Sequence, residues 1–115
     1  MHEMGIALQI VEIATASLPA GSKDIRVEKV NLKIGKLAAV VPASLRFCFE
    51  VVTKDTPFAG STLDIEEVPV VVKCRGCKIE WTVTGPDFRC KTCQNGEVDI
   101  LSGREIDIIS IEVTD

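Results

Sequence analysis

The sequence predicts an α+β fold: a small mixed or antiparallel three-stranded sheet with two helices, plus an inserted four-cysteine zinc-ribbon lobe. Three observations predict it. Two segments show the three- and four-residue spacing of apolar residues typical of helices, β-branched segments alternate as strands do, and two C-x-x-C pairs lie in a short polar stretch. At 115 residues the chain can bury one main core but not two.

The first helix is predicted over residues 3–18, where apolar residues recur at three- and four-residue spacing. Pro19 and Gly21 end it, because proline cannot continue a helix and glycine accepts turn dihedrals. A strand follows over residues 25–34. Its apolar alternation changes phase at Glu28 and Lys29, which predicts a β-bulge there.

The second helix is predicted to begin at Pro42, which suits a first helical turn. A further strand over residues 62–72 is interrupted by Pro69, and residues 104–113 form a long β-branched strand with a second change of phase. The apolar stripe of the second helix consists of Leu45, Cys48, Phe49 and Val52. Cys48 is interpreted as a small buried hydrophobe of this stripe.

The strongest motif comprises Cys74, Cys77, Cys90 and Cys93, two C-x-x-C pairs separated by twelve residues. Two such pairs can complete a closed tetrahedral shell around Zn²⁺, a structural rather than a catalytic arrangement. A rubredoxin-like iron site is the rival interpretation. The segment around the cysteines is short and polar, and it is too small to fold by burial alone, so the metal supplies the missing stability.

These features predict two domains: a discontinuous α/β domain of residues 1–70 and 97–115, and a zinc-binding domain of residues 71–96. Five cysteines are an odd number, and the paired spacing favours a metal in a reducing compartment over disulfides. No signal peptide or membrane span is recognisable, so we expect a cytoplasmic protein without a membrane partner.

The only histidine is His2. Considered alone, it can be an ordinary solvated terminal residue. It can also chelate a metal, because the α-amine of Met1, the backbone amides of His2 and Glu3, and the imidazole can close adjacent rings around Ni²⁺ or Cu²⁺. With one histidine and no nucleotide-binding or nucleophile-elbow motif, the chain offers no anchor for an enzyme mechanism.

Two rival functions remain at this point. Basic residues near the cysteine pairs favour a nucleic-acid-binding zinc ribbon, but a net charge of −4 and the few aromatic residues between the pairs favour no nucleic-acid partner. A small redox protein is the second rival, and visible absorbance of the purified protein would support it.

The start M-H-E-M, the stretch I34-G-K-L-A-A-V-V-P-A-S-L-R-F-C-F-E, the two cysteine pairs and the ending G103-R-E-I-D-I-I-S-I-E-V together resemble the HypA/HybF family of hydrogenase nickel-incorporation proteins. The resemblance implies a nickel metallochaperone that is not an enzyme. Its cargo, Ni²⁺, would be bound by His2 with nitrogens of Met1, His2 and Glu3, and its structural Zn²⁺ by Cys74, Cys77, Cys90 and Cys93.

The resemblance also implies partners: a HypB-type GTPase, the hydrogenase large-subunit precursor and, as a further option, urease maturation factors. The chain itself would be a monomer or a homodimer. One departure stands out. Some family members carry additional histidines near the zinc lobe, and this chain has none.

Overall fold

The computed structural model describes residues 2–19 and 24–114. The chain forms two compact units, each considered by itself below. Unit 1 consists of Met1–Lys33, Val40–Glu66 and Asp107–Asp115, and unit 2 of Ile34–Ala39 and Glu67–Ile106.

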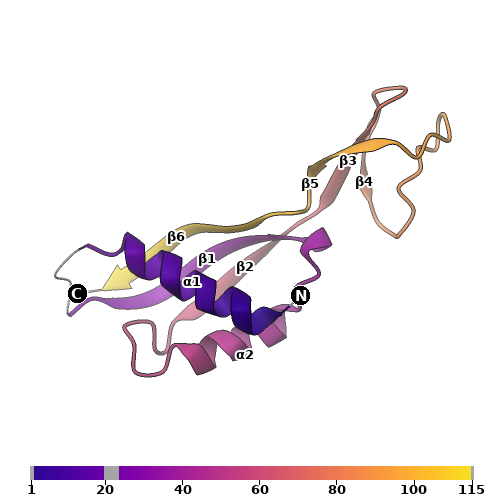
Figure 1. Cartoon of the computed structure of the whole chain (residues 1–115). Helices are drawn as coiled ribbons and strands as arrows, with labels where there is room; N and C mark the ends of the chain where they lie inside the picture. Colours follow the sequence, from indigo (N-terminus) through magenta and orange to yellow (C-terminus); the bar gives the residue numbers. More distant parts are fainter. Residues whose placement is uncertain (1, 20–23, 115) are drawn as a thin grey trace. The chain divides into compact units, whose positions relative to one another are not determined.

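Unit 1 is built on a three-stranded sheet with the order β2-β1-β6. Its helices are α1 (Glu3–Ser17) and α2 (Pro42–Val52), and its strands are β1 (Arg26–Gly35), β2 (Thr62–Val68) and β6 (Ile106–Thr114). In Figure 1, β2 runs in the same direction as β1 and β6 runs in the opposite direction. The sheet is therefore mixed, and the predicted α+β class is confirmed.

The buried faces of these elements explain why they form. Helix α1 buries Ile6, Ala7, Ile10 and Ala14, which recur at helical spacing. Helix α2 begins at Pro42 and buries Leu45 and Phe49, whereas Cys48 of the predicted stripe is only half-buried. In β1 the buried positions shift from Val27 to Val30, the change of phase that predicted a bulge at Glu28 and Lys29.

Unit 2 contains the second sheet, with the order β4-β3-β5. Its strands are β3 (Val70–Cys74), β4 (Glu80–Val83) and β5 (Val98–Ser102), and a short 3₁₀ helix η1 spans Lys36–Ala38. Strand β3 pairs antiparallel with both neighbours. Pro69 separates β2 from β3, as expected for a residue that cannot donate a ladder hydrogen bond.

Two glycines of unit 2 come unusually close together. A Cβ atom on Gly35 would lie 1.9 Å from the carbonyl oxygen of Gly103, a distance no side chain can accept. Gly103 has φ +112°, and a Cβ there would lie 2.9 Å from the Cα of Val70. Two backbone hydrogen bonds hold these segments together: Gly35 N donates to Glu105 O at 2.7 Å, and Leu37 N donates to Gly103 O at 2.8 Å.

Unit 2 takes its extent from the pairing of its strands. It runs from Glu67 to Ile106 and also includes residues 34–39, and within it β3 and β5 pair along their length. No helix in the described part of the chain has both the length and the hydropathy needed to cross a membrane.

Candidate metal centres

The four predicted zinc ligands converge at one end of unit 2. The sulfur atoms of Cys74, Cys77, Cys90 and Cys93 all lie within 4.8 Å of one another. The Sγ atoms of Cys74 and Cys93 are 3.4 Å apart, and those of Cys77 and Cys90 are 3.5 Å apart. Tetrahedral coordination at a Zn–S distance of about 2.3 Å requires sulfur separations of about 3.8 Å. The donor set and its spacing thus fit a closed four-thiolate zinc site.

The two cysteine pairs have the same pattern of backbone hydrogen bonds, so each pair contributes its two sulfur atoms from an equivalent turn. Lys78 N donates to Cys74 O at 3.0 Å, and Gln94 N donates to Cys90 O at 2.8 Å. The first cysteine of each pair also donates its N–H to a carbonyl oxygen five residues ahead, at 2.9 Å in both cases. Lys78 and Gln94 adopt left-handed φ values of 66° and 62°. Glycine would adopt this conformation without steric cost.

Replacing Lys78 with glycine is expected to stabilise the lobe by roughly 0.5 to 1 kcal/mol, because it removes a left-handed non-glycine residue. Zinc transfer to a chromogenic chelator should become slower. The matched control is Lys91→Gly, beside the second cysteine pair. It removes the same charge, but Lys91 does not adopt a positive φ. Faster zinc loss from Lys78→Gly than from Lys91→Gly would contradict this account.

The thiols of the cluster divide into two kinds by the direction in which their pKa values shift. Hydrogen bonds from backbone N–H groups, first that of Cys93, lower the pKa of Cys90 to about 6. The Ile79 N–H lowers the pKa of Cys77, but the neighbouring Cys90 sulfur and burial outweigh it and raise the pKa to about 11. The pKa of Cys74 is likewise lowered, chiefly by the Cys77 N–H. The site already holds thiolate character, which is the form that binds zinc.

The two cysteines of each pair differ in how deeply they are buried. Cys74 and Cys90 are buried, at 0% and 1% exposure, whereas Cys77 is half-buried and Cys93 is exposed. Arg75, the basic residue next to Cys74, forms an ion pair with a carboxylate: its Nε lies 2.8 Å from Asp99 Oδ1 on β5. This ion pair raises the pKa of Arg75 and links the first cysteine turn to β5. Nothing in the sequence pattern pointed to Asp99.

The amino-terminal candidate site lies at the start of α1. His2 is exposed, occupies the N-cap position, and uses no side-chain atom to cap the helix. Its carbonyl oxygen accepts the first helical hydrogen bond, from Ile6 N at 3.3 Å. Its imidazole is thus not engaged in capping. Met1, the predicted source of the α-amine, lies outside the described residues.

The Glu3 side chain has a structural role that the sequence did not reveal. Its Oε2 accepts a hydrogen bond from the backbone N–H of Val41, the N-cap residue of α2, at 3.2 Å. This N–H lowers the pKa of the Glu3 carboxyl. A carboxylate at this place also favours both helix starts, where unpaired N–H groups carry partial positive charge. Glu3 therefore ties the beginning of α1 to the beginning of α2.

A mixed-sheet domain with an exposed terminal histidine, joined in one chain to a cluster of four convergent cysteines, defines a metal-binding protein. The family model for HypA, described as "Hydrogenase/urease nickel incorporation, metallochaperone", matches residues 1–113. The chain belongs to this family of nickel metallochaperones, which act as hydrogenase maturation factors. The four-cysteine cluster is consistent with structural zinc, and nickel is the cargo of the family.

Curated relatives and solved structures agree. The chain is 64% identical over 113 residues to the hydrogenase maturation factor HypA of Desulfosudis oleivorans, covering 98% of each chain. It is 56% identical to that of Desulfatibacillum aliphaticivorans, covering all of this chain and 88% of the relative. The solution structure of the Ni metallochaperone HypA from Helicobacter pylori shares the fold, with a TM-score of 0.66, 23% identity and 97% coverage of both chains. The resemblance in the sequence is thereby confirmed.

Proposed function

We propose that this chain carries Ni²⁺ at its extreme amino terminus, with the His2 imidazole as the essential ligand. The α-amine of Met1 and the backbone nitrogens of His2 and Glu3 complete the set. The observation that carries this proposal is the placement of the sole histidine of the chain at the N-cap of α1, exposed and without a capping bond. Nitrogen donors in a plane suit Ni²⁺.

The position of the site at a helix start supports backbone ligation. The first N–H groups of an α-helix have no intrahelical acceptor. The first helical bond of α1 uses the N–H of Ile6, so a metal on the nitrogens of His2 and Glu3 costs the helix no hydrogen bond. Partial positive charge at the helix start disfavours a bare cation, but it favours deprotonated amide ligands. An exposed site of this kind can pass its metal to a partner.

In the other metal centre, we assign Cys74, Cys77, Cys90 and Cys93 as the ligands of one structural Zn²⁺. Four thiolates close the coordination shell and leave no position for substrate. On this basis the zinc lobe is a domain, which we place at residues 71–96, and the α/β domain comprises residues 1–70 and 97–115. Rubredoxin-like iron chemistry would instead give a coloured protein.

The family assignment also supports a proposal for the partners. We propose that the chain works with a HypB-type GTPase and the hydrogenase large-subunit precursor, as a non-enzymatic carrier in the cytoplasm. Support comes from the family assignment and from the four thiol ligands, which need a reducing compartment. Nickel delivery to urease is a second option, favoured by the family description.

The direct test of the terminal site is to place two residues ahead of Met1. This extension turns the α-amine into an amide and moves the chelate away from the chain end, so nickel affinity should fall at least tenfold. Isothermal titration of zinc-loaded protein with a native amino terminus provides the reference. The same two residues added after the C-terminus are the control. Equal nickel affinity in all three proteins would show that the amine is not a ligand.

The Glu3 carboxylate is expected to position the site rather than to bind nickel. Replacing Glu3 with alanine should lower nickel affinity several-fold, because the terminus loses its hydrogen bond to Val41. The visible absorption bands of bound nickel should stay where they are, since the ligand atoms are unchanged. Glu12→Ala is the matched control, an exposed carboxylate further along α1. A shift of the nickel bands in Glu3→Ala would instead make the carboxylate a ligand.

A further inference from the structure

The zinc lobe has a small pocket between β4 and the chain that follows this strand. The volume of the pocket is about 230 Å³, and its lining residues all belong to unit 2. The indole of Trp81 on β4 lines it, together with the charged side chains of Arg89 and Lys91, which flank Cys90 in the sequence. The pocket therefore gathers two positive charges and a neutral N–H group in one place.

The indole of Trp81 is available to a ligand. In the β3-β4 pair Trp81 lies opposite Val72, which is fully buried, so the two side chains share one face of the sheet. Trp81 itself is half-buried, so its ring is partly covered by the lobe and partly accessible. Within residues 2–19 and 24–114 its N–H meets no acceptor. A tryptophan N–H usually finds a partner when it becomes covered.

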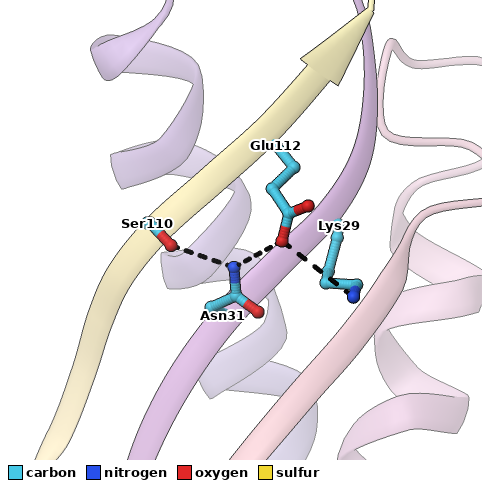
Figure 2. Close-up of polar contacts among 4 residues, drawn as sticks. All are labelled: Lys29, Asn31, Ser110 and Glu112. Atoms are coloured by element: carbon cyan, nitrogen blue, oxygen red, sulfur yellow. Dashed lines mark hydrogen bonds and ion pairs between the residues drawn. The ribbon is translucent and has the colours of Figure 1, made fainter.

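Two other basic side chains are already paired with carboxylates. On the open face of the unit 1 sheet, Lys29 Nζ lies 4.0 Å from Glu112 Oε2, and this oxygen also accepts a hydrogen bond from Asn31 Nδ2 at 3.0 Å (Figure 2). At the first cysteine pair, Arg75 Nε lies 2.8 Å from Asp99 Oδ1. An incoming anion would have to compete with these carboxylates for the positive charge.

Arg89 and Lys91 have no such competitor. Both are exposed, and neither forms an ion pair within the part of the chain that the structure describes. The carboxylate that lines the pocket, Asp87, is engaged with the backbone, because its Oδ1 accepts a hydrogen bond from the Arg89 N–H at 2.9 Å. An aspartate that bonds to the main chain two residues ahead holds a turn. The three charged side chains together leave the pocket with a net positive charge.

We propose that this pocket binds the carboxylate of an aspartate or glutamate side chain from an acidic segment of a partner protein. Arg89 and Lys91 donate charge-assisted hydrogen bonds to the carboxylate, and the indole N–H of Trp81 donates a third. The volume of about 230 Å³ suits one side chain, since pockets that take whole small molecules measure roughly 300 to 1,000 Å³. The pocket thus anchors one residue of a longer segment.

Charge and aromatic content favour a protein segment over nucleic acid. Residues 73–91 contain five basic and two acidic residues, whereas the chain as a whole has a net charge of −4. Four thiolates around one Zn²⁺ add a charge of −2 to the same lobe, so little positive charge remains to attract a phosphate backbone at long range. Trp81 is the one aromatic residue in the described lining of the pocket, and binding of single-stranded nucleic acid relies on stacking of successive bases on aromatic rings.

The sole tryptophan of the chain reports directly on the pocket. The probe is a ten-residue peptide of alternating glutamate and glycine with both ends blocked, added to the zinc-loaded chain without nickel. We expect the indole N–H resonance of Trp81 to shift in a saturable way, and the peptide to bind about tenfold more tightly than its glutamine counterpart. Arg89→Gln and Lys91→Gln should each weaken binding by about two- to fivefold, the usual range for an exposed ion pair.

Lys36→Gln is the matched control. Lys36 is an exposed lysine of the same unit, on η1 and outside the lining of the pocket, so its loss should leave the affinity for the peptide unchanged. Zinc content shows that each variant keeps a folded lobe, and the peptide titration of the unchanged chain decides the matter even if one variant loses zinc. An unshifted indole resonance, equal binding of the glutamine peptide, or an equal effect of Lys36→Gln would overturn the proposal.

A single-stranded oligothymidine of ten nucleotides tests the alternative partner. It should bind more weakly than the glutamate peptide. Tighter binding that weakens steeply with salt, and that Arg89→Gln reduces, would make the pocket a nucleic-acid site and contradict the proposal. None of these measurements involves nickel, so their outcome is independent of the proposed terminal site.

Discussion

Nickel binding is expected to disappear when His2 is replaced with alanine. The chain contains no second imidazole that could substitute, and the remaining terminal nitrogens cannot complete a comparable chelate. We expect nickel affinity to fall by at least about a hundredfold, the result of removing one ring from a multidentate site. Titration of the zinc-loaded protein, followed calorimetrically and by visible absorption, measures the change.

The structure indicates that this loss would be local. His2 is exposed, and its side chain makes no capping bond to α1. Helicity and zinc content of His2→Ala should therefore equal those of the unchanged chain. Combining the variant with the amino-terminal extension separates the ligands, because a site without imidazole should no longer respond to loss of the amine. Wild-type nickel affinity in His2→Ala would remove the basis of the proposed terminal site.

Zinc loss is the second large expected effect. Replacing Cys74 with alanine leaves three thiolates and an open shell, and structural zinc sites of this kind contribute roughly 10 to 16 kcal/mol to folding. We expect zinc content well below one equivalent and loss of the β3-β4-β5 sheet. The helices of unit 1 should persist, since their buried side chains belong to another core. Zinc analysis and circular dichroism report the two parts separately.

The fifth cysteine provides a matched control for that experiment. Cys48 lies on α2, half-buried and outside the cysteine cluster. Cys48→Ala should keep one zinc and lose at most about 1 kcal/mol of stability, because a single sulfur leaves a partly buried position. One full equivalent of zinc in all four cluster variants would disprove the assignment of the ligands.

The elements that could be predicted from the sequence are those whose side chains repeat with a period. Helix α1 is one example, because burial of one helix face imposes the three- and four-residue spacing of its apolar side chains. The change of phase between the buried residues Val27 and Val30 in β1 is another. Strands β4 and β5 were harder to predict. They span only Glu80–Val83 and Val98–Ser102, so their alternation of half-buried and exposed residues is too short to stand out, and they lie beside the cysteine cluster rather than a core of their own.

The cysteine cluster was predictable for a different reason: ligand chemistry fixes its spacing. The contact between Glu3 and Val41 was not, because it joins an exposed side chain to a backbone N–H 38 residues away. A hydrogen bond to the main chain needs no particular residue at the donor position, so it leaves no pattern. The same holds for the approach of Gly35 to Gly103, where the sequence shows glycines but not their meeting.

The closed base of the zinc lobe has a consequence for the order in which the chain folds. Ser102 Oγ donates to Pro69 O at 2.8 Å, and Val71 pairs with Ser102, so the chain segments that lead into and out of the zinc lobe meet. Once zinc has closed the lobe, the loop between β2 and β6 shrinks from about 40 residues to about 6, which lowers the entropic cost of closing it by about 1.5 kcal/mol. Strand β6 must pair with β1 from far along the chain, and such non-local pairing is slow. We therefore expect early zinc capture to shorten the search by which the last strand finds its place. On this account, metal supply during synthesis would influence the folding rate of a domain that does not itself bind the zinc.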